Sequence, residues 1–134
     1  MAFRILLAED NPADAELIAE ALDGWTRTVD LVHAANGREA LEHLHSAWRP
    51  DILLLDLNMP KVDGLDVLEA LEDDEELRTI PTIVLTSSAS PADVRAAYER
   101  HANTFFQKPM QFDGYEKLLA LIEKYWADTA LRSS

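Results

Sequence analysis

Acidic, hydroxyl and amino side chains stand at the ends of four apolar segments of this sequence. Glu9 and Asp10 follow the segment FRILLA, and Asp56 ends the segment DILLLD. Thr86 ends IPTIVLT, and Lys108 follows NTFFQ. Carboxylate oxygens select hard divalent cations such as Mg²⁺, and a carboxylate can also act as a nucleophile. These five residues would form one reactive site if the fold brings the segment ends together.

Repulsion within such a cluster favours a bound metal. Two like charges about 4 Å apart repel by about 4 kcal/mol at an effective dielectric constant near 20. Clustering Asp10 and Asp56 without compensation would raise one pKa and weaken the fold. Lys108 offers one positive charge against three carboxylates, those of Glu9, Asp10 and Asp56. We therefore expect Mg²⁺ as the cofactor.

Each of these residues, taken singly, also has a structural explanation. Glu9 and Asp10 could favour the N-terminus of the next helix through its dipole. Asp56 could cap a loop, and an isolated Thr86 is more often structural than functional. We favour the functional interpretation because all of them fall at the same end of successive apolar segments.

Five strand-like segments alternate with five helical ones. The strands are expected at 3–8, 28–34, 51–56, 80–86 and 103–107, and three of them are nearly continuous in apolar residues. Five βα units predict an α/β fold, a flavodoxin-like (βα)5 doubly wound parallel sheet with strand order 2-1-3-4-5. In such a sheet ligands bind beyond the carboxyl ends of the strands, where the reactive residues lie.

Capping signals predict where the helices begin. Asn11 and Pro12 supply an N-cap and a first-turn proline, and Gly24 is expected to stop that helix. Asn36 and Glu39 have the spacing of a capping box at the second helix. The remaining helices are expected after Asp63-Gly64, from Ser90-Pro91, and near Phe112.

Length, composition and charge narrow the class of protein. The 134 residues predict a single domain, with a core at about 3–126 and a short tail at 127–134. The net charge of −13 opposes binding to nucleic acid and favours protein partners or metal-held anions. There is no cysteine, and no segment is suited to cross a membrane, so we expect a cytoplasmic protein. No metal-ligand spacing links the histidines, which we interpret as structural or solvated: His33, His43, His45 and His101.

Four motifs together resemble the receiver domain of bacterial two-component response regulators. They are the acidic pair in LLAEDNPAD, LLLDLNMPKVDG around Asp56, the strand end IVLTSS, and FFQKPM with its lysine. The resemblance runs from about Phe3 to Tyr125. It implies that Asp56 accepts a phosphoryl group from a sensor histidine kinase, and that phosphorylation changes a protein-binding surface. It also implies no enzyme activity beyond self-phosphorylation from small donors and autodephosphorylation.

The resemblance also assigns roles around Asp56. Asp10, Asp56 and the backbone carbonyl of Asn58 would ligate Mg²⁺, Glu9 would hold it through water, and Lys108 would pair with the phosphoryl oxygens. Thr86 and Phe105 would form the switch, with phenylalanine where many receivers carry a tyrosine. Two positions would tune the lifetime of the phosphoryl group, namely Asn58 and Ser88.

A narrower resemblance points to single-domain regulators paired with phytochrome-type histidine kinases. It rests on NPAD, on His-Ala-Asn before the fifth strand, and on IEKYW near the end. It implies a homodimer through the fourth helix, the fifth strand and the fifth helix. The aromatic residues Phe106, Tyr115 and Trp126 fit a partner surface, although they fit a core equally well.

An enzyme is the alternative. Mg²⁺-dependent phosphatases of the haloacid-dehalogenase class also use a strand-end aspartate, a threonine and a lysine. They carry a second aspartate two residues after the nucleophile as general acid, and this chain has Asn58 there. A flavodoxin is disfavoured because the first strand ends in Glu-Asp and not in a phosphate-binding loop.

Overall fold

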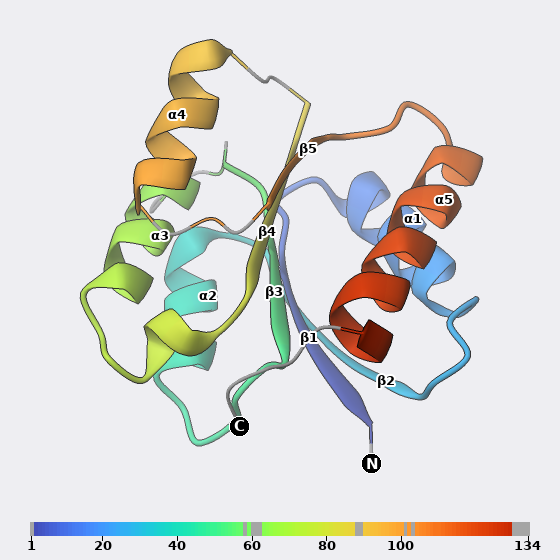
Figure 1. Ribbon diagram of the computed structural model, residues 1–134, viewed down its shortest axis with the longest axis horizontal. Helices are drawn as coiled ribbons and strands as arrows, with labels where there is room; N and C mark the ends of the chain where they lie inside the picture. Colours follow the sequence, from blue (N-terminus) through green and yellow to red (C-terminus); the bar gives the residue numbers. More distant parts are fainter. Residues whose placement is uncertain are drawn as a thin grey trace.

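A five-stranded parallel sheet forms the centre of the computed structural model (Figure 1). The structure describes residues 2–57, 59, 63–87, 90–100, 102 and 104–129, with 127–129 described by their backbone alone. The strand order is β2-β1-β3-β4-β5, and every neighbouring pair is parallel. The predicted flavodoxin-like order 2-1-3-4-5 is therefore confirmed. The strands span Phe3–Ala8 (β1), Val29–Ala34 (β2), Ile52–Leu55 (β3), Thr82–Thr86 (β4) and Thr104–Gln107 (β5).

Strands β3 and β4 are shorter than the sequence predicts. Asp51 and Asp56 flank β3 without belonging to it, and β4 begins at Thr82, after Pro81. Proline has no N–H to give to a ladder, which accounts for the later start of β4. The backbone N–H of Asp56 still donates to the Ala8 carbonyl at 3.0 Å. Asp56 is thus tied to the sheet although it stands beyond the strand.

Helices cover both faces of the sheet, as Figure 1 shows. Helices α1 and α5 pack together on one face, and α2, α3 and α4 pack side by side on the other. Their bounds are Pro12–Leu22 (α1), Gly37–Leu44 (α2), Gly64–Glu72 (α3), Pro91–Arg100 (α4) and Phe112–Ile122 (α5). A 3₁₀ turn, η1 (Leu77–Thr79), precedes β4, and a π-helical segment, η2 (Glu123–Thr129), continues α5.

The predicted caps hold, with two differences. The side chains of Asn11, Asn36 and Asp63 each accept a hydrogen bond from a backbone N–H in the first turn of the helix that follows. Glu39 accepts from the N–H of the residue before Asn36, at 3.2 Å, so the capping box is shifted by one residue. Helix α1 ends at Leu22, two residues before Gly24, and η2 carries helical backbone three residues into the predicted tail.

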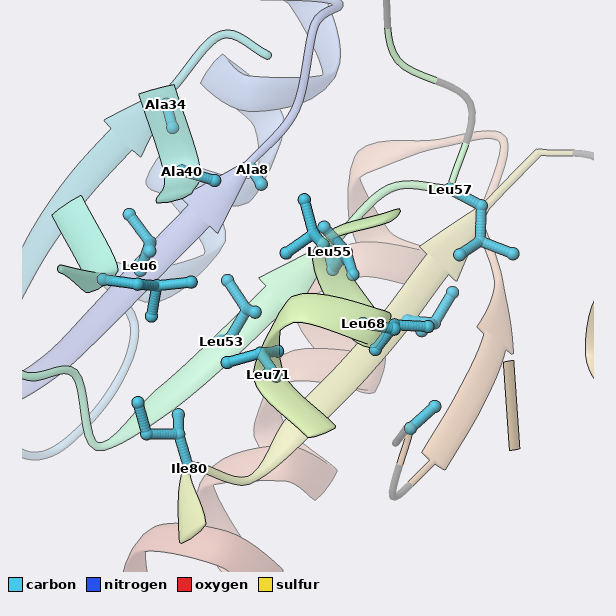
Figure 2. Packing of buried hydrophobic residues seen from close by; sticks show 14 of the residues in the cluster. Leu6, Ala8, Ala34, Ala40, Leu53, Leu55, Leu57, Leu68, Leu71 and Ile80 are labelled. Carbon is cyan, nitrogen blue, oxygen red and sulfur yellow. The ribbon is translucent and has the colours of Figure 1, made fainter. Parts of the chain in front are cut away.

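Alternation along the strands divides the core into two layers. Leu53 and Leu55 of β3 belong to the layer under α2, α3 and α4, while Ile52 and Leu54 belong to the layer under α1 and α5. All four side chains are fully buried. Figure 2 shows the first layer, in which leucines of β1 and β3 lie with those of α3. Burial on both faces explains why this strand is aliphatic throughout.

No helix in the described part of the chain is both long enough and apolar enough to span a membrane.

Candidate functional site

The carboxyl ends of β1, β3, β4 and β5 hold the residues of the site. Glu9 directly follows β1, and its N–H donates to the Ala34 carbonyl at 3.0 Å. Lys108 directly follows β5, and its N–H donates to the Thr86 carbonyl at 2.8 Å. Because each of these backbones continues a sheet hydrogen bond, the side chains leave the sheet edge from fixed positions.

The ammonium of Lys108 joins three carboxylates. Its Nζ lies 2.7 Å from Glu9 Oε1, 3.0 Å from Asp14 Oδ2 and 3.4 Å from Asp56 Oδ2. The Lys108 side chain is 7% exposed and that of Asp56 is 6% exposed. Because water screens these charges little, the ion pairs are stronger than surface ones. Burial lowers the pKa of Lys108, but the hydrogen bonds to Glu9 and Asp14 outweigh it and raise that pKa overall.

The carboxylate of Glu9 is a poorly stabilised charge. Glu9 is only 1% exposed to solvent. Burial raises its pKa to about 7, the hydrogen bond from Lys108 opposes the rise, and the charge of Asp56 adds to it. The N–H of Asn11 donates to Glu9 Oε2 at 3.1 Å and fixes the carboxylate in place. A single ammonium therefore does not fully compensate the carboxylates at this point.

A hard divalent cation fits the same residues. Glu9, Asp10 and Asp56 each offer a carboxylate oxygen, and these oxygens all lie within 4.8 Å of one another. Asp10 is exposed, whereas Glu9 and Asp56 are buried, so the group opens to solvent on one side. Oxygen ligands with room for retained water are typical of Mg²⁺ and related ions. No histidine belongs to this group, and within the described chain no other cluster of His, Asp and Glu has such geometry.

Thr86 lies on β4, and Phe105 lies on the neighbouring edge strand, β5. Thr86 is fully buried at the end of β4. Phe105 is half-buried on β5 and packs against the layer under α2, α3 and α4. The N–H of Phe105 donates to the hydroxyl of Tyr98 in α4 at 3.1 Å. Asn58 and Ser88, which we expected to tune the phosphoryl lifetime, lie outside the described residues, as do His101 and Asn103 of the narrower motif.

Sequence reasoning missed three contributors to the site. Asp14 stands in the first turn of α1 and is a direct partner of Lys108. His33 lies at the end of β2, and its Nε2 is 2.7 Å from the Glu9 carbonyl, to which it donates. Asp14 was visible in NPAD, and its position one turn after Glu9 and Asp10 was the available signal.

Gly64 is the third. A Cβ at this position would stand 2.5 Å from the Asp56 carbonyl oxygen and 2.5 Å from the Leu57 Cα. Its N–H donates to the Leu57 carbonyl at 2.9 Å. The start of α3 therefore packs directly on the backbone of Asp56, at a distance that only glycine allows. The Asp63-Gly64 pair was predicted only as a turn.

Comparisons with known proteins agree with this fold. The response regulator receiver domain family matches residues 5–123. The response regulator Rcp1 of Synechocystis is 37% identical over 131 residues, covering 93% of this chain and 89% of Rcp1. The probable methanogenesis regulatory protein FilR2 of Methanothrix harundinacea is 40% identical over 131 residues, covering 92% of this chain and 83% of FilR2.

Solved structures extend the comparison. The phosphorylated cyanobacterial phytochrome response regulator RcpA superposes with a TM-score of 0.94 and 36% identity, covering 100% of both chains. The Mn²⁺-bound form of Rcp1 has a TM-score of 0.90 and 35% identity, covering 98% of this chain and 99% of Rcp1. The chain belongs to the response regulator receiver domain family. Phytochrome response regulators are among its homologues, and these matches favour the receiver over the phosphatase alternative.

Proposed function

We propose that Asp56 is the phosphoacceptor of this receiver domain and that a sensor histidine kinase is the donor. The observation that carries the proposal is the Lys108 ammonium, buried between Glu9, Asp14 and Asp56 at the carboxyl end of the sheet. Phosphoryl transfer needs positioning and charge neutralisation more than covalent chemistry, and this arrangement offers both. Asp56 is held at the sheet edge by its backbone bond to β1.

The proposed phosphoryl transfer needs no reactant beyond the phosphohistidine, Asp56 and a proton from solvent. A carboxylate oxygen of Asp56 attacks the phosphorus of the phosphohistidine, a P–O bond forms, and the P–N bond breaks. The imidazole keeps the electron pair of the broken bond and takes a proton from solvent. Lys108 lies 3.4 Å from Asp56 Oδ2, so its positive charge stands beside the oxygens that become negative. Autodephosphorylation is attack by water, which returns the carboxylate and releases inorganic phosphate.

Mg²⁺ is the metal we propose. Asp10, Asp56 and the Asn58 backbone carbonyl would ligate it, and Glu9 would hold it through water. A divalent ion at this place would neutralise phosphoryl oxygens and offset the burial and the charge of Asp56, which both raise the pKa of Glu9. The homologue Rcp1 has a Mn²⁺-bound form, which supports a divalent ion in this chain as well.

The switch we propose joins Thr86 to Phe105. The Thr86 hydroxyl would donate to a phosphoryl oxygen, and the space it leaves would admit the Phe105 ring. Val84 is paired with Phe105 across the β4–β5 ladder, so Phe105 lies on the strand next to that of Thr86. The proposal gives Asn58 and Ser88 the role of setting the phosphoryl lifetime.

The partners we propose are proteins and not nucleic acid, in keeping with the net charge of −13. A phytochrome-type kinase is proposed because homologues of this chain are phytochrome and bacteriophytochrome response regulators. A homodimer through α4, β5 and α5 is proposed because this side carries exposed apolar side chains, Leu121 at 62% and Tyr125 at 57%. They line an apolar groove of about 270 Å³ with Thr104, Phe106, Ile122 and Trp126.

Mass spectrometry with acetyl phosphate and Mg²⁺ tests the phosphoacceptor. We expect one labile phosphoryl adduct on the wild-type chain and none on Asp56→Asn. Asp66→Asn, which changes an exposed aspartate at the start of α3, is the matched control and should be phosphorylated like the wild type. An adduct on Asp56→Asn, or none on the wild type, contradicts the proposal. Sustained hydrolysis of unrelated phosphomonoesters would favour the phosphatase.

Light scattering after size exclusion tests the dimer. We expect the mass of two chains for the wild type and of one chain for Leu121→Asp. Arg38→Asp places a new aspartate on α2, on the other face of the sheet, and should leave the dimer intact. A wild-type monomer, with and without beryllofluoride as phosphoryl mimic, contradicts this part of the proposal.

A further inference from the structure

Asp14 is the partner of Lys108 that is held least tightly. Its side chain is 26% exposed, against 1% for Glu9 and 6% for Asp56. Its N–H donates to the Asn11 side chain at 3.2 Å, so α1 fixes the backbone while the carboxylate reaches 3.0 Å from Lys108 Nζ. An ion pair that is partly open to water is weaker than a buried one. Of the two carboxylates that are not phosphorylated, Asp14 makes the longer and more exposed contact and is therefore the one that Lys108 would release before Glu9.

The helix that packs against α1 carries a buried hydroxyl whose proton is not used in a hydrogen bond among the described residues. Tyr115 of α5 is 1% exposed, and its hydroxyl has no hydrogen-bond partner among the described residues. Ala15, the neighbour of Asp14 in α1, belongs to the same buried cluster as Tyr115, and burial and then the negative charge of Asp14 raise the pKa of Tyr115 to about 12. Helices α1 and α5 pack against each other and carry these two side chains. A buried donor without an acceptor is unfavourable, so the arrangement favours a state in which the hydroxyl is paired.

Phosphorylation changes the demand on Lys108. An ammonium has three protons to donate, and in this structure three carboxylates already take them. By analogy with other phospho-residues, a phosphoryl group on Asp56 adds a charge of about −1.5 to −2 and new acceptor oxygens. Lys108 already contacts Asp56, so it can follow that side chain to one phosphoryl oxygen, but donating to a second one requires it to leave Glu9 or Asp14.

We propose that Asp14 is a positioning residue that competes with the phosphoryl group for Lys108, and that Asp14 accepts the hydroxyl proton of Tyr115 in a hydrogen bond once Lys108 has moved. This inference rests on the proposed phosphoacceptor role of Asp56. It connects the phosphoryl site to α5, because the Lys108–Asp14 contact is lost and the Tyr115–Asp14 contact is gained. Since α5 contributes to the proposed dimer surface, phosphorylation could affect that surface through Tyr115.

Beryllofluoride affinity measures the competition. With Mg²⁺ present, Asp14→Asn should bind beryllofluoride about five- to tenfold more tightly than the wild type, a range typical of the net contribution of one hydrogen bond. Glu16→Gln removes an exposed charge from the same helix without touching Lys108 and should stay within about twofold. An Asp14→Asn affinity equal to that of Glu16→Gln overturns the proposal.

The Lys108→Met variant distinguishes competition for Lys108 from direct repulsion between Asp14 and the beryllofluoride anion. In Lys108→Met, the change Asp14→Asn should alter the affinity by less than about twofold, because the contested ammonium is gone. An equal gain in both backgrounds means that Asp14 acts by repulsion alone, and overturns the proposal.

The Tyr115 hydroxyl gives a readout that a merely structural role of Asp14 would not move. The chain has three tyrosines, so ¹³Cζ-tyrosine labelling gives three resonances, and Tyr115→Phe assigns one. We expect that resonance to shift when beryllofluoride binds to the wild type and to stay in place in Asp14→Asn. Tyr115→Phe should weaken beryllofluoride binding about two- to threefold, with no effect in the Asp14→Asn background.

The outcomes separate the two proposals. A wild-type chain that takes up neither phosphoryl group nor beryllofluoride overturns both. If the wild type binds beryllofluoride and the Tyr115 resonance stays in place, only the role of Asp14 and Tyr115 is overturned. Because Tyr115→Phe deletes a single oxygen, the resonance and this variant decide the matter even if Asp14→Asn does not fold.

Discussion

Replacing Lys108 by methionine removes the positive charge that the metal-free cluster depends on. At an effective dielectric constant near 20, contacts of 2.7, 3.0 and 3.4 Å are each worth about 5–6 kcal/mol before desolvation. Burying the ammonium offsets most of that gain. Removing one partner of a buried ion pair costs about 3–5 kcal/mol, and we expect this loss for Lys108→Met at pH 8.5 without metal. A domain of this length has about 7–15 kcal/mol of stability, so the variant still folds.

The loss should depend on pH and on metal. The pKa of Glu9 is already raised to about 7, and losing the hydrogen bond from Lys108 raises it further. At pH 6 a proton on Glu9 then replaces the ammonium, and the cost of Lys108→Met falls to about 1–2 kcal/mol. Millimolar Mg²⁺ should restore most of the stability at pH 8.5, since it binds the folded chain only.

Urea unfolding followed by circular dichroism measures these differences. With a slope of about 1.5 kcal/mol per molar urea, the expected loss at pH 8.5 in EDTA lowers the midpoint by about 2–3 M. Lys117→Met removes an exposed lysine of α5 and should change the stability by less than about 0.5 kcal/mol. A cost for Lys108→Met below about 1 kcal/mol at pH 8.5, or an equal cost at pH 6, refutes the reasoning.

Three further predictions concern the surroundings of the site. Gly64→Ala should destabilise the fold by about 2 kcal/mol in urea unfolding, because the new Cβ would stand 2.5 Å from the Asp56 carbonyl oxygen, and an unchanged midpoint contradicts this. The pKa of Glu9 is raised from 4.5 to about 7 in the folded state, so the free energy of unfolding of the metal-free wild type should fall by about 3 kcal/mol as the pH rises from 4.5 to 7. Glu9→Gln should remove this dependence on pH, and parallel pH profiles of the two proteins would contradict the prediction. Tyr98→Phe should speed amide hydrogen exchange of Phe105 about fivefold by deleting the acceptor 3.1 Å from its N–H, whereas equal exchange in both proteins would speak against that bond.

The strands were predictable because they depend on patterns within short stretches, and their order was predicted from the alternation of five strands with five helices in a chain of this length. Residues 52–55 read Ile-Leu-Leu-Leu, and only a strand buried on both faces suits such a run. The helix starts were predictable for the same reason, since Asn11, Asn36 and Asp63 cap the turns that directly follow them. The end of α1 was not predictable in this way. The helix ends at Leu22 and Asp23 is its C-cap, so Gly24 lies one residue beyond the cap.

The contacts within the site were less predictable because they join distant segments. His33, which we had interpreted as structural or solvated, lies near the end of the neighbouring strand and donates a hydrogen bond to the carbonyl of Glu9. Phe105 lacks the hydroxyl that a tyrosine would bring, and the α4 residue Tyr98 provides one to its backbone. Neither contact follows from spacing, since each depends on how a side chain leaves its own strand or helix.

Local sequence patterns were enough to predict which residues reach the carboxyl end of the sheet. Apolar runs define the strands, parallel order places their ends together, and Glu9, Asp56 and Lys108 follow those ends directly. How the charges are shared depends on the three-dimensional fold. Lys108 meets Asp14, 94 residues earlier, because the residue after β5 and the first turn of α1 both lie at the carboxyl edge of the sheet. Gly64 brings the start of α3 against Asp56 for a similar reason: close approach depends on three-dimensional packing, which local sequence does not encode.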